Sequence, residues 1–444
     1  MTLVSHMDAD GICAAAIMST ALDRMGVEHR VNFVKMLYLE DVEELEPADL
    51  TIFTDLGSSQ LHNLEKFSGH DTIILDHHAP EQTAGWKELT HLNAHHHSIE
   101  GTHEISGAGM AYLLAGELGE NADLSALAVI GAIGDVQDAW GKLTGKNREI
   151  ADDAVKSGLM DRSIDLLLYG RHTRSLPRAL QMFTDPLIPG ISNSPSGCTS
   201  LLRKLGIPLR ENGHWRRPAD LSWDEKRRLA TELISRAYDS VPPELTGYVP
   251  GLIIGETYTL KGEEHLQLRG AEEFATCLNS TARQEHPEIG LQVAKGDRKN
   301  HLRAALDIMK SQRKHIAKGM ESVENGGLKN GPNGYVQYFD ATGVVRDTLI
   351  GTLVGVVLGS GLCDPYRPLV GMVSESGFTK MSGRCSRLLF LRGLDIGRAF
   401  RHAARAVGGE GGGHTVACGA RVPEGKITEF LIEFEKYCSH EKCA

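Results

Sequence analysis

The chain has 444 residues, of which 41% are hydrophobic, 24% are charged and 6% are aromatic. This composition is that of a globular protein and excludes disordered and collagen-like chains, and at roughly 150 residues per domain the length predicts two or three domains. Lys and Arg number 47 against 58 Asp and Glu, and the resulting net charge of −11 argues against a protein that coats nucleic acid through bulk positive charge.

The first part of the chain, up to about residue 180, alternates short apolar runs with helical stretches. We expect strands over residues 3–5, 31–34, 50–54 and 72–75, and an amphipathic helix over residues 12–25. This alternation predicts an α/β fold in which a mostly parallel sheet is flanked by helices. Residues 1–100 carry 5 Lys and Arg against 17 Asp and Glu, so the acidity of the chain is concentrated here.

His6, Asp8 and Asp10 occupy every second position directly after the first predicted strand. On an extended chain, side chains at this spacing point to one side. The three residues would then span about 13 Å, so the chain either curls at Gly11 or the side chains serve two cations that lie ~3.5 to 4 Å apart. Alternatively, Asp8 or Asp10 caps the helix that begins near residue 12.

Later apolar runs also end in side chains that can bind a metal ion. Asp55 follows residues 50–54, Asp76, His77 and His78 follow residues 72–75, and Asp135 follows the apolar run 129–133. Ligands of open α/β sheets bind at the carboxyl ends of the strands, so we expect all these residues at one sheet edge.

Imidazoles combined with several carboxylates suit Mn²⁺, Co²⁺ or Zn²⁺ better than an all-oxygen Mg²⁺ site, and the oxygen-rich set favours manganese. Two cations at such an edge would activate water and bind phosphoryl oxygens, so the residues predict metal-assisted hydrolysis. The eight cysteines include no C-x-x-C pair, and we expect them to be reduced thiols.

The middle of the chain, residues 185–248, is punctuated by Pro and Gly and predicts a helical connector. The basic side chains in and before it form either a solvated helix face or the path of a single strand: Arg171, His172, Arg174, Arg216, Arg217 and Lys226 to Arg228. His95, His96 and His97 are expected in a polar loop.

The last part of the chain, residues 335–435, alternates strand-like runs with helices and predicts a second, smaller α/β domain. We expect a flexible loop over residues 325–334, between the two halves. A glycine-rich run at residues 408–413 allows backbone amides to approach an anion closely. With Arg384, which can bind a phosphate through two parallel hydrogen bonds, and His414, this run predicts a phosphate clamp.

These motifs resemble those of the DHH phosphoesterases, in which Asp76-His77-His78 stands as the name-giving triplet. His6-x-Asp8-x-Asp10-Gly11, Asp55 and Asp135 match the other metal motifs of that family in order. Ser382-Gly383-Arg384 and Gly411-Gly412-Gly413-His414 resemble the DHH-associated domain of the subgroup that contains RecJ nucleases, nanoRNases and cyclic-dinucleotide phosphodiesterases.

The resemblance implies roles for individual residues. One metal would be held by His6, Asp8 and Asp55, and the second by Asp10, Asp55, His77 and Asp135, with Asp55 as the bridge. Asp76 would lie behind His77 and fix its ring, and His78 would face the scissile phosphate. The substrate would be bound by Ser382, Arg384, Gly411, Gly412, Gly413 and His414.

Within the family, the chain is similar to archaeal RecJ-like exonucleases in residues 104–109, 131–138 and 274–279. This similarity implies a nuclease with two Mn²⁺, or Mg²⁺ or Co²⁺ instead, that hydrolyses single-stranded DNA or RNA to mononucleotides in repair, replication or RNA turnover. A nanoRNase or cyclic-dinucleotide phosphodiesterase would share every motif and is the alternative. A catalytically silent replisome scaffold is the second alternative.

We therefore predict a catalytic DHH domain over residues 1–185, a connector over 186–330 and a DHH-associated domain over 331–444 that forms a cleft with the first. No apolar run approaches the ~18 residues that span a bilayer, and the N-terminus shows no signal pattern, so we expect a cytoplasmic protein without a membrane partner. The implied partners are single-stranded nucleic acid and a replisome or repair-helicase subunit, and a homo-oligomer is compatible with the sequence.

Overall fold

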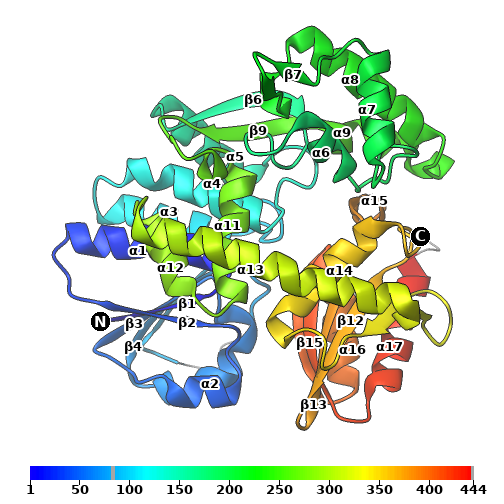
Figure 1. Cartoon of the computed structure of the whole chain (residues 1–444). Coiled ribbons are helices and arrows are strands. Elements are labelled where there is room, and N and C mark those ends of the chain that lie inside the picture. The colour runs from blue at the N-terminus through cyan, green and yellow to red at the C-terminus, as the bar shows by residue number, and fades with distance from the viewer. Residues whose placement is uncertain (82–85, 442–444) are drawn as a thin grey trace. The chain divides into compact units, whose positions relative to one another are not determined.

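The computed structural model of the chain describes residues 1–81 and 86–441 (Figure 1). The chain forms two compact units, and each is assembled from two separate segments. The first unit comprises Met1–Ile164 and Glu256–Lys310, and the second comprises Asp165–Gly255 and Ser311–Ala444. The boundaries 185/186 and 330/331 suggested by the sequence remain predictions. In the structure, the chain crosses from one compact unit to the other between residues 164 and 165, 255 and 256, and 310 and 311.

The first unit is built on a five-stranded parallel sheet with the order β2-β1-β3-β4-β5. Its strands are β1 (Thr2–His6), β2 (Arg30–Val34), β3 (Leu50–Thr54), β4 (Asp71–Asp76) and β5 (Leu89–Asn93). The α/β fold and the four strands expected from the sequence are confirmed, and β5 is an addition. Successive residues of a strand enter different cores, because side chains alternate between the two faces of a sheet. Leu3, Ile52 and Leu75 pack in one core, and Val4, Phe53 and Ile74 in the other.

One core of this unit is helical and rich in alanine. It contains α1 (Ala9–Arg24), α3 (Gly107–Leu118), α4 (Ser125–Gly134), α5 (Gly145–Lys156), α11 (Ala271–Arg283) and α12 (Pro287–Ala294). The helix α1 is capped by Asp8, whose carboxylate accepts a hydrogen bond from the amide of Gly11 at 3.0 Å. The other core contains α2 (Leu39–Glu44) and the 3₁₀ segment η1 (Ser58–Phe67).

The apolar run before Asp135, which we grouped with the runs that end at the sheet edge, is a helix and not a strand. Residues 125–134 form α4, and Ala128 to Ile133 are all buried. A helix that is apolar on every side has no period that distinguishes it from a buried strand, which is why the sequence pattern misled.

In the second unit, the middle region of the chain is mostly helical, as the sequence predicts. It contains α6 (Leu176–Gln181), α7 (Pro195–Lys204), α8 (Trp223–Tyr238), α9 (Val249–Ile253) and the short hairpin β7 (Arg210–Glu211) and β8 (His214–Trp215). These helices share one apolar core with Leu388 and Leu391 of α15 (Arg387–Leu391). Two strands carry the chain out of the first unit and back, β6 (Met160–Leu166) and β9 (Ile254–Leu260), which pair with each other.

The second unit also contains a mixed six-stranded sheet with the order β10-β11-β12-β13-β15-β14. Its strands are β10 (Lys329–Asn330), β11 (Gln337–Asp340), β12 (Leu369–Glu375), β13 (Phe378–Arg384), β14 (Glu410–His414) and β15 (Ala417–Pro423). The helices α14 (Asp347–Ser360), α16 (Ile396–Ala406) and α17 (Ile427–Glu441) belong to the same part. No helix among the described residues is long and apolar enough to cross a membrane.

The segment expected as a flexible loop between the halves lies inside the second unit instead. The chain passes from the first unit to the second within the helix α13 (Asn300–Ser322), before residues 325–334 begin. The end of this segment is organised by the buried carboxylate of Glu435, which accepts hydrogen bonds from the amides of Asn333 at 2.6 Å and Tyr335 at 2.9 Å.

Candidate metal centre

Six predicted metal ligands come together in the first unit, and each stands at the end of an element. His6 ends β1, Asp8 and Asp10 lie at the start of α1, Asp55 follows β3, His77 follows β4 and Asp135 follows α4. The parallel strands end at the same sheet edge, which is why residues far apart in sequence meet there.

The ligating atoms form two groups that share Asp55, and in each group these atoms lie within 4.8 Å of one another. The first contains His6, Asp8 and Asp55, and the second contains Asp10, Asp55, His77 and Asp135. Asp55 Oδ2 lies 3.4 Å from His6 Nδ1, whereas Asp55 Oδ1 lies 3.1 Å from His77 Nε2. The two oxygens of one carboxylate therefore face different histidines, as a ligand that bridges two cations would.

Two of the candidate carboxylates, Asp55 and Asp135, lie at turns in which one residue has a positive φ. Asp55 has a φ of 62°, and its amide donates to the carbonyl of Leu75 at 2.8 Å, so the chain leaves β3 in the left-handed region. Val136, directly after Asp135, has a φ of 58°. This conformation is unfavourable for a β-branched residue, and it ends α4 immediately after Asp135.

The ring of His77 is oriented by the backbone and not by Asp76. Its Nδ1 donates to the carbonyl of Gly101 at 2.6 Å, which leaves Nε2 facing the carboxylates of Asp55 and Asp135. Gln137 Nε2 donates to the same carbonyl at 3.0 Å, and Gln137 Oε1 accepts from Asn147. The implied role of Asp76 behind His77 is therefore wrong, and a carbonyl performs it.

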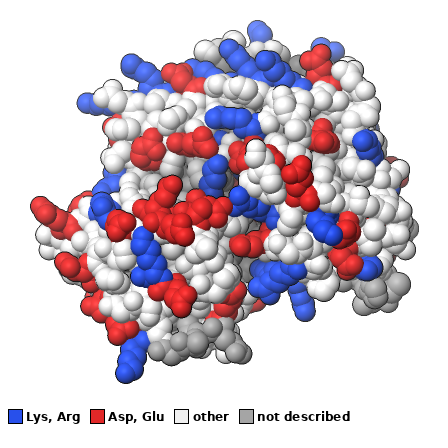
Figure 2. Space-filling view, turned by 90° about the horizontal axis from the view of Figure 1, so that it is seen from below, with Lys and Arg blue, Asp and Glu red and all other residues white. Residues whose placement is uncertain are grey.

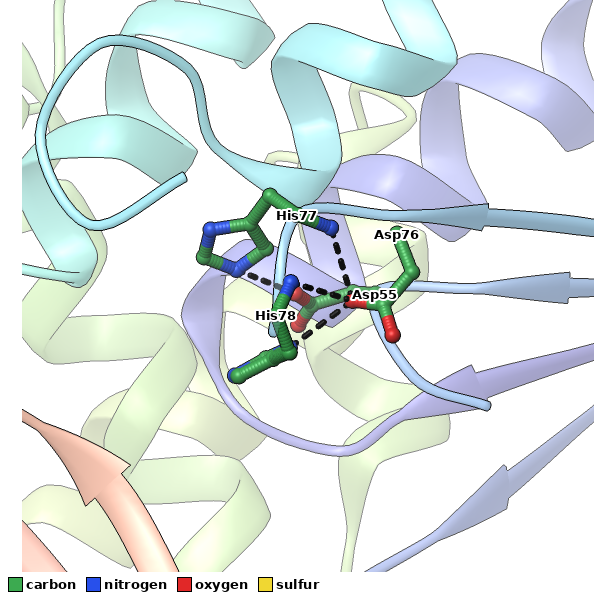
Figure 3. Close-up of side chains that lie close together, drawn as sticks. All are labelled: Asp55, Asp76, His77 and His78. Atoms are coloured by element: carbon green, nitrogen blue, oxygen red, sulfur yellow. Dashed lines mark hydrogen bonds and ion pairs between the residues drawn. The ribbon is translucent and has the colours of Figure 1, made fainter. Parts of the chain in front are cut away.

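Asp76 holds the ring of His78 (Figure 3). Its Oδ1 accepts hydrogen bonds from His78 Nδ1 at 2.8 Å and from the amide of His77 at 2.8 Å, and its Oδ2 accepts from the amide of Ser58 at 2.9 Å. Burial opposes ionisation of Asp76, but His78 and these donors outweigh it and lower the pKa of this carboxyl. A further group of possible ligands contains Asp55, Asp76, His77 and His78, but the oxygens of Asp76 are already occupied by these donors.

Asp10 lies against the first turn of α3, which sequence reasoning did not assign to the site. Its carboxylate accepts hydrogen bonds from the amides of Gly107 at 2.6 Å and Ala108 at 3.0 Å. A Cβ at Gly107 would lie 2.4 Å from Asp55 Oδ1, and one at Gly131 would lie 2.3 Å from Asp10 Oδ1. Only glycine fits at these positions, and the glycines in the runs 104–109 and 131–138 were the available signal.

The charges at the site fit a bound cation. Burial and the charge of Asp55 raise the pKa of Asp10 to about 8, and burial with the charge of Asp10 raises the pKa of Asp135. Burial lowers the pKa of His6 and of His77, but their carboxylate neighbours outweigh it and raise both pKa values well above the ordinary value. Protons therefore compensate the carboxylates in the metal-free chain, and divalent cations would replace them.

The acidity of the chain is also visible at its surface. Figure 2 shows Asp and Glu side chains gathered in a dense patch on the face viewed, with Lys and Arg in several separate groups. A polyanion would therefore need locally positive surfaces or bound cations to approach.

The predicted substrate-binding residues lie in the second unit, on β13 and β14. Ser382 and Arg384 are in β13, and Gly411, Gly412, Gly413 and His414 are in β14. No described residue forms a hydrogen bond with Arg384 Nε, which is buried, and burial lowers the pKa of this guanidinium. A buried cation of this kind is costly unless an anion joins it.

Part of the basic connector is used inside the protein. Arg171 and Lys226 both bind the buried carboxylate of Asp165, at 2.5 Å and 2.8 Å. Arg216 is 7% exposed and binds Glu225 through both terminal nitrogens at 2.7 Å. These three cations support the fold, whereas the histidines 95–97 are exposed at the surface of a short 3₁₀ turn, in line with a polar segment.

Three family models match the chain. Residues 1–134 match the DHH family, N-terminal domain, residues 168–245 match the DHH-CID domain, and residues 357–440 match the DHHA1 domain. Among curated proteins, an uncharacterized protein of Methanocaldococcus jannaschii is 28% identical over 436 residues, which cover 97% of this chain and 91% of that protein.

Solved structures share the fold at low sequence identity. CDC45 from Entamoeba histolytica is 15% identical with a TM-score of 0.64, covering 99% of this chain and 95% of that chain. RecJ in complex with Mn²⁺ from Thermus thermophilus is 18% identical with a TM-score of 0.56, covering 99% of this chain and 52% of that chain. The chain thus spans about half the length of that RecJ.

Proposed function

Because the chain belongs to the DHH family, we propose that it is a metal-dependent phosphodiesterase that releases mononucleotides from single-stranded DNA or RNA. The observation that carries this proposal is the carboxylate of Asp55, whose two oxygens face two separate groups of ligands. Divalent cations bound in such a pair of sites activate water and neutralise phosphoryl oxygens. Manganese is proposed because the ligand set mixes imidazole with carboxylate, and the RecJ neighbour is a Mn²⁺ complex by name.

The chain's own groups have distinct tasks in this proposal. His6, Asp8 and Asp55 would hold one cation, and Asp10, Asp55, His77 and Asp135 the other. Gly101 accepts the hydrogen bond of His77 Nδ1 and so directs Nε2 toward the carboxylates, where a bound cation would displace the Nε2 proton, and the amides of Gly107 and Ala108 fix the carboxylate of Asp10. His78, aligned by Asp76, is proposed to stabilise charge that develops on the scissile phosphate.

The second unit is proposed to bind the substrate. Ser382, Arg384, the glycines 411–413 and His414 would hold a phosphate, because a buried guanidinium without a hydrogen-bond partner at Nε offers a charged donor to an anion. The fold shared with CDC45 leaves a non-catalytic role to be tested, but all six proposed ligands are present in this chain.

The test is hydrolysis of a long, end-labelled single strand with Mn²⁺, beside a dinucleotide and a cyclic dinucleotide. We expect successive loss of mononucleotides from the long strand. Asp55→Asn should abolish it because both cation sites lose a ligand, while Asp138→Asn, an acidic residue outside the ligand groups, is the matched control. Cleavage of the short substrates alone would replace the exonuclease with a dinucleotide phosphodiesterase, and no metal-dependent cleavage would favour a scaffold.

A further inference from the structure

We propose that Gln137 and Asn147 are positioning residues that hold the segment 101–108 in place, and that this segment sets the affinity of the second group of candidate ligands for a divalent cation. The proposal rests on the proposed function and deepens it, because it concerns side chains that would support the cation without touching it. Both residues and the segment lie within the first unit.

The segment 101–108 supports two ligands of the second group. The carbonyl of Gly101 accepts a hydrogen bond from His77 Nδ1 at 2.6 Å, and the amides of Gly107 and Ala108 donate to the carboxylate of Asp10. The part of the segment before α3 contains neither helix nor strand. Contacts from other elements must therefore fix its position before it can orient the ring and the carboxylate.

The carboxamide of Gln137 provides such contacts from the end of α4. Its Nε2 donates to the carbonyl of Gly101 at 3.0 Å and to that of Ile105 at 3.2 Å, so both of its protons are used. Nε2 also lies 3.4 Å from His77 Nδ1, but this ring nitrogen donates its own proton to Gly101. Gln137 is 1% exposed, so solvent does not compete for these carbonyls.

The end of α4 directs both a candidate ligand and its support toward the site. The amide of Val136 donates to the carbonyl of Ile133, and that of Gln137 donates to the carbonyl of Ala132. With a φ of 58° at Val136, these are the two hydrogen bonds of a Schellman motif. This one turn therefore determines the positions of Asp135, just before Val136, and of Gln137, just after it.

Asn147, in the first turn of α5, fixes the other end of the Gln137 carboxamide. Its Nδ2 donates to Gln137 Oε1 at 2.5 Å, and its Oδ1 accepts a hydrogen bond from the amide of Ser106 at 3.3 Å. The backbone amide of Asn147 donates to the carbonyl of Glu104 at 2.8 Å. Because Asn147 is 2% exposed, leaving its amide or that of Gln137 unpaired would be costly, so the two side chains hold each other in one orientation.

The first group of candidate ligands takes its positions from other elements. His6 ends β1, with Nδ1 at 3.1 Å from Asp8 and 3.4 Å from Asp55, and Asp8 caps α1. Losing the support of a metal ligand typically costs 10 to 100-fold in metal affinity. The loss of Gln137 or Asn147 should therefore weaken one cation position and spare the other.

The test is Mn²⁺ binding to the full chain without substrate, measured by calorimetry and by electron paramagnetic resonance. We expect the wild type to bind two Mn²⁺ with the spin coupling of a bridged pair. Gln137→Met keeps the length of the side chain and removes its amide. It should weaken one of the two positions by about 10 to 100-fold, and at Mn²⁺ concentrations that fill only the other position the spin-coupled signal should disappear.

Asn147→Ala should weaken the same position, because it leaves the Gln137 carboxamide without its partner. The double variant should lie within threefold of the worse single variant, since both substitutions release the same segment. Losses that multiply, or a loss at both positions, would overturn the proposal.

Gln337→Met is the matched control. Gln337 is 3% exposed and holds a loop of the second unit in the same way, with Nε2 donating to the carbonyl of Asp364 and Oε1 accepting from its amide, both at 3.0 Å. Mn²⁺ affinities of Gln137→Met equal to those of this control would overturn the proposal.

Hydrogen exchange in EDTA provides a measurement that needs no metal. Exchange of residues 101–108 should be faster in Gln137→Met than in Gln337→Met, and equal exchange would overturn the proposal. A wild type that binds no Mn²⁺ would overturn this proposal and the proposed function together. Two intact Mn²⁺ positions without hydrolysis of any strand or dinucleotide would overturn the proposed function alone.

Discussion

At the scale of single residues, the carboxylate of Asp76 orients the ring of His78, so the two side chains are expected to act together. Asp76 Oδ1 accepts a hydrogen bond from His78 Nδ1 at 2.8 Å, whereas the ring of His77 donates its hydrogen bond to the carbonyl of Gly101. A residue that acts by orienting another should therefore have no effect once its partner is gone.

We predict that Asp76→Asn and His78→Gln each reduce the rate of hydrolysis by about 10 to 100-fold, the usual cost of losing a supporting group at a metal site. The double variant should lie within threefold of the worse single variant, because both substitutions remove the same aligned imidazole. Steady-state kinetics with Mn²⁺, after circular dichroism has established that each variant is folded, provide the measurement. Losses that multiply would show two independent roles.

The pKa of Asp10 predicts the pH dependence of the metal-free chain. In the folded chain this pKa is about 8, because of burial and the charge of Asp55, against roughly 4 in an unfolded chain. Between these values the folded state binds the additional proton, so unfolding releases it and stability falls as pH rises.

In EDTA, the Tm of the wild type should therefore fall relative to that of Asp10→Asn as the pH rises from 5 to 8. Thermal melts of both proteins over this range measure the difference, and the variant serves as the control for every other titrating group. Curves that remain parallel would show that Asp10 titrates in its ordinary range.

At the scale of elements, α3 contributes its first turn to the site, while Gly116 in its last turn occupies an exposed position of the helix. Gly107 begins α3 and lies against Asp55, whereas a Cβ at Gly116 would have no heavy atom within 4 Å. The same substitution in one helix can therefore separate packing at the site from helix stability.

We predict that Gly107→Ala reduces hydrolysis by about 100-fold, because its Cβ would displace the Asp55 carboxylate and a shift of ~1 Å has that cost. Gly116→Ala should leave the rate unchanged and raise the free energy of unfolding by about 0.5 to 1 kcal/mol. Rates and denaturant melts of the two variants make the comparison. Equal activity in both would remove α3 from the site.

At the scale of the whole molecule, the proposed metal ligands belong to one unit and the proposed phosphate residues to the other. A ligand stabilises the elements that bind it, by an amount that grows with its concentration relative to Kd. Mn²⁺ alone should therefore increase hydrogen-exchange protection around residues 2–11, 50–57 and 101–108, and leave residues 369–384 and 410–423 unchanged. Exchange measured by mass spectrometry with and without Mn²⁺ is the check, and an equal increase in both units would contradict it.

The sequence by itself determined four of the five strands of the first sheet and the candidate ligands that follow them. Leu3, Val4, Ile52 and Phe53 stand in short apolar runs because both faces of the sheet are covered, and each run is followed by polar residues where the strand stops. Local patterns of this kind can be recognised without knowing what lies opposite.

Only the tertiary structure decided how these ligands are held and shared. In the folded chain, the ring of His77 is oriented by the carbonyl of Gly101, and that of His78 by the carboxylate of Asp76. Asp135 reaches the site at the end of a helix, and Gly107 and Gln137 lie beside the candidate ligands. Several of these contacts join residues more than twenty positions apart, so no periodicity in the sequence records them. The division into two units was hidden for the same reason, because each is made of segments that are distant in the chain.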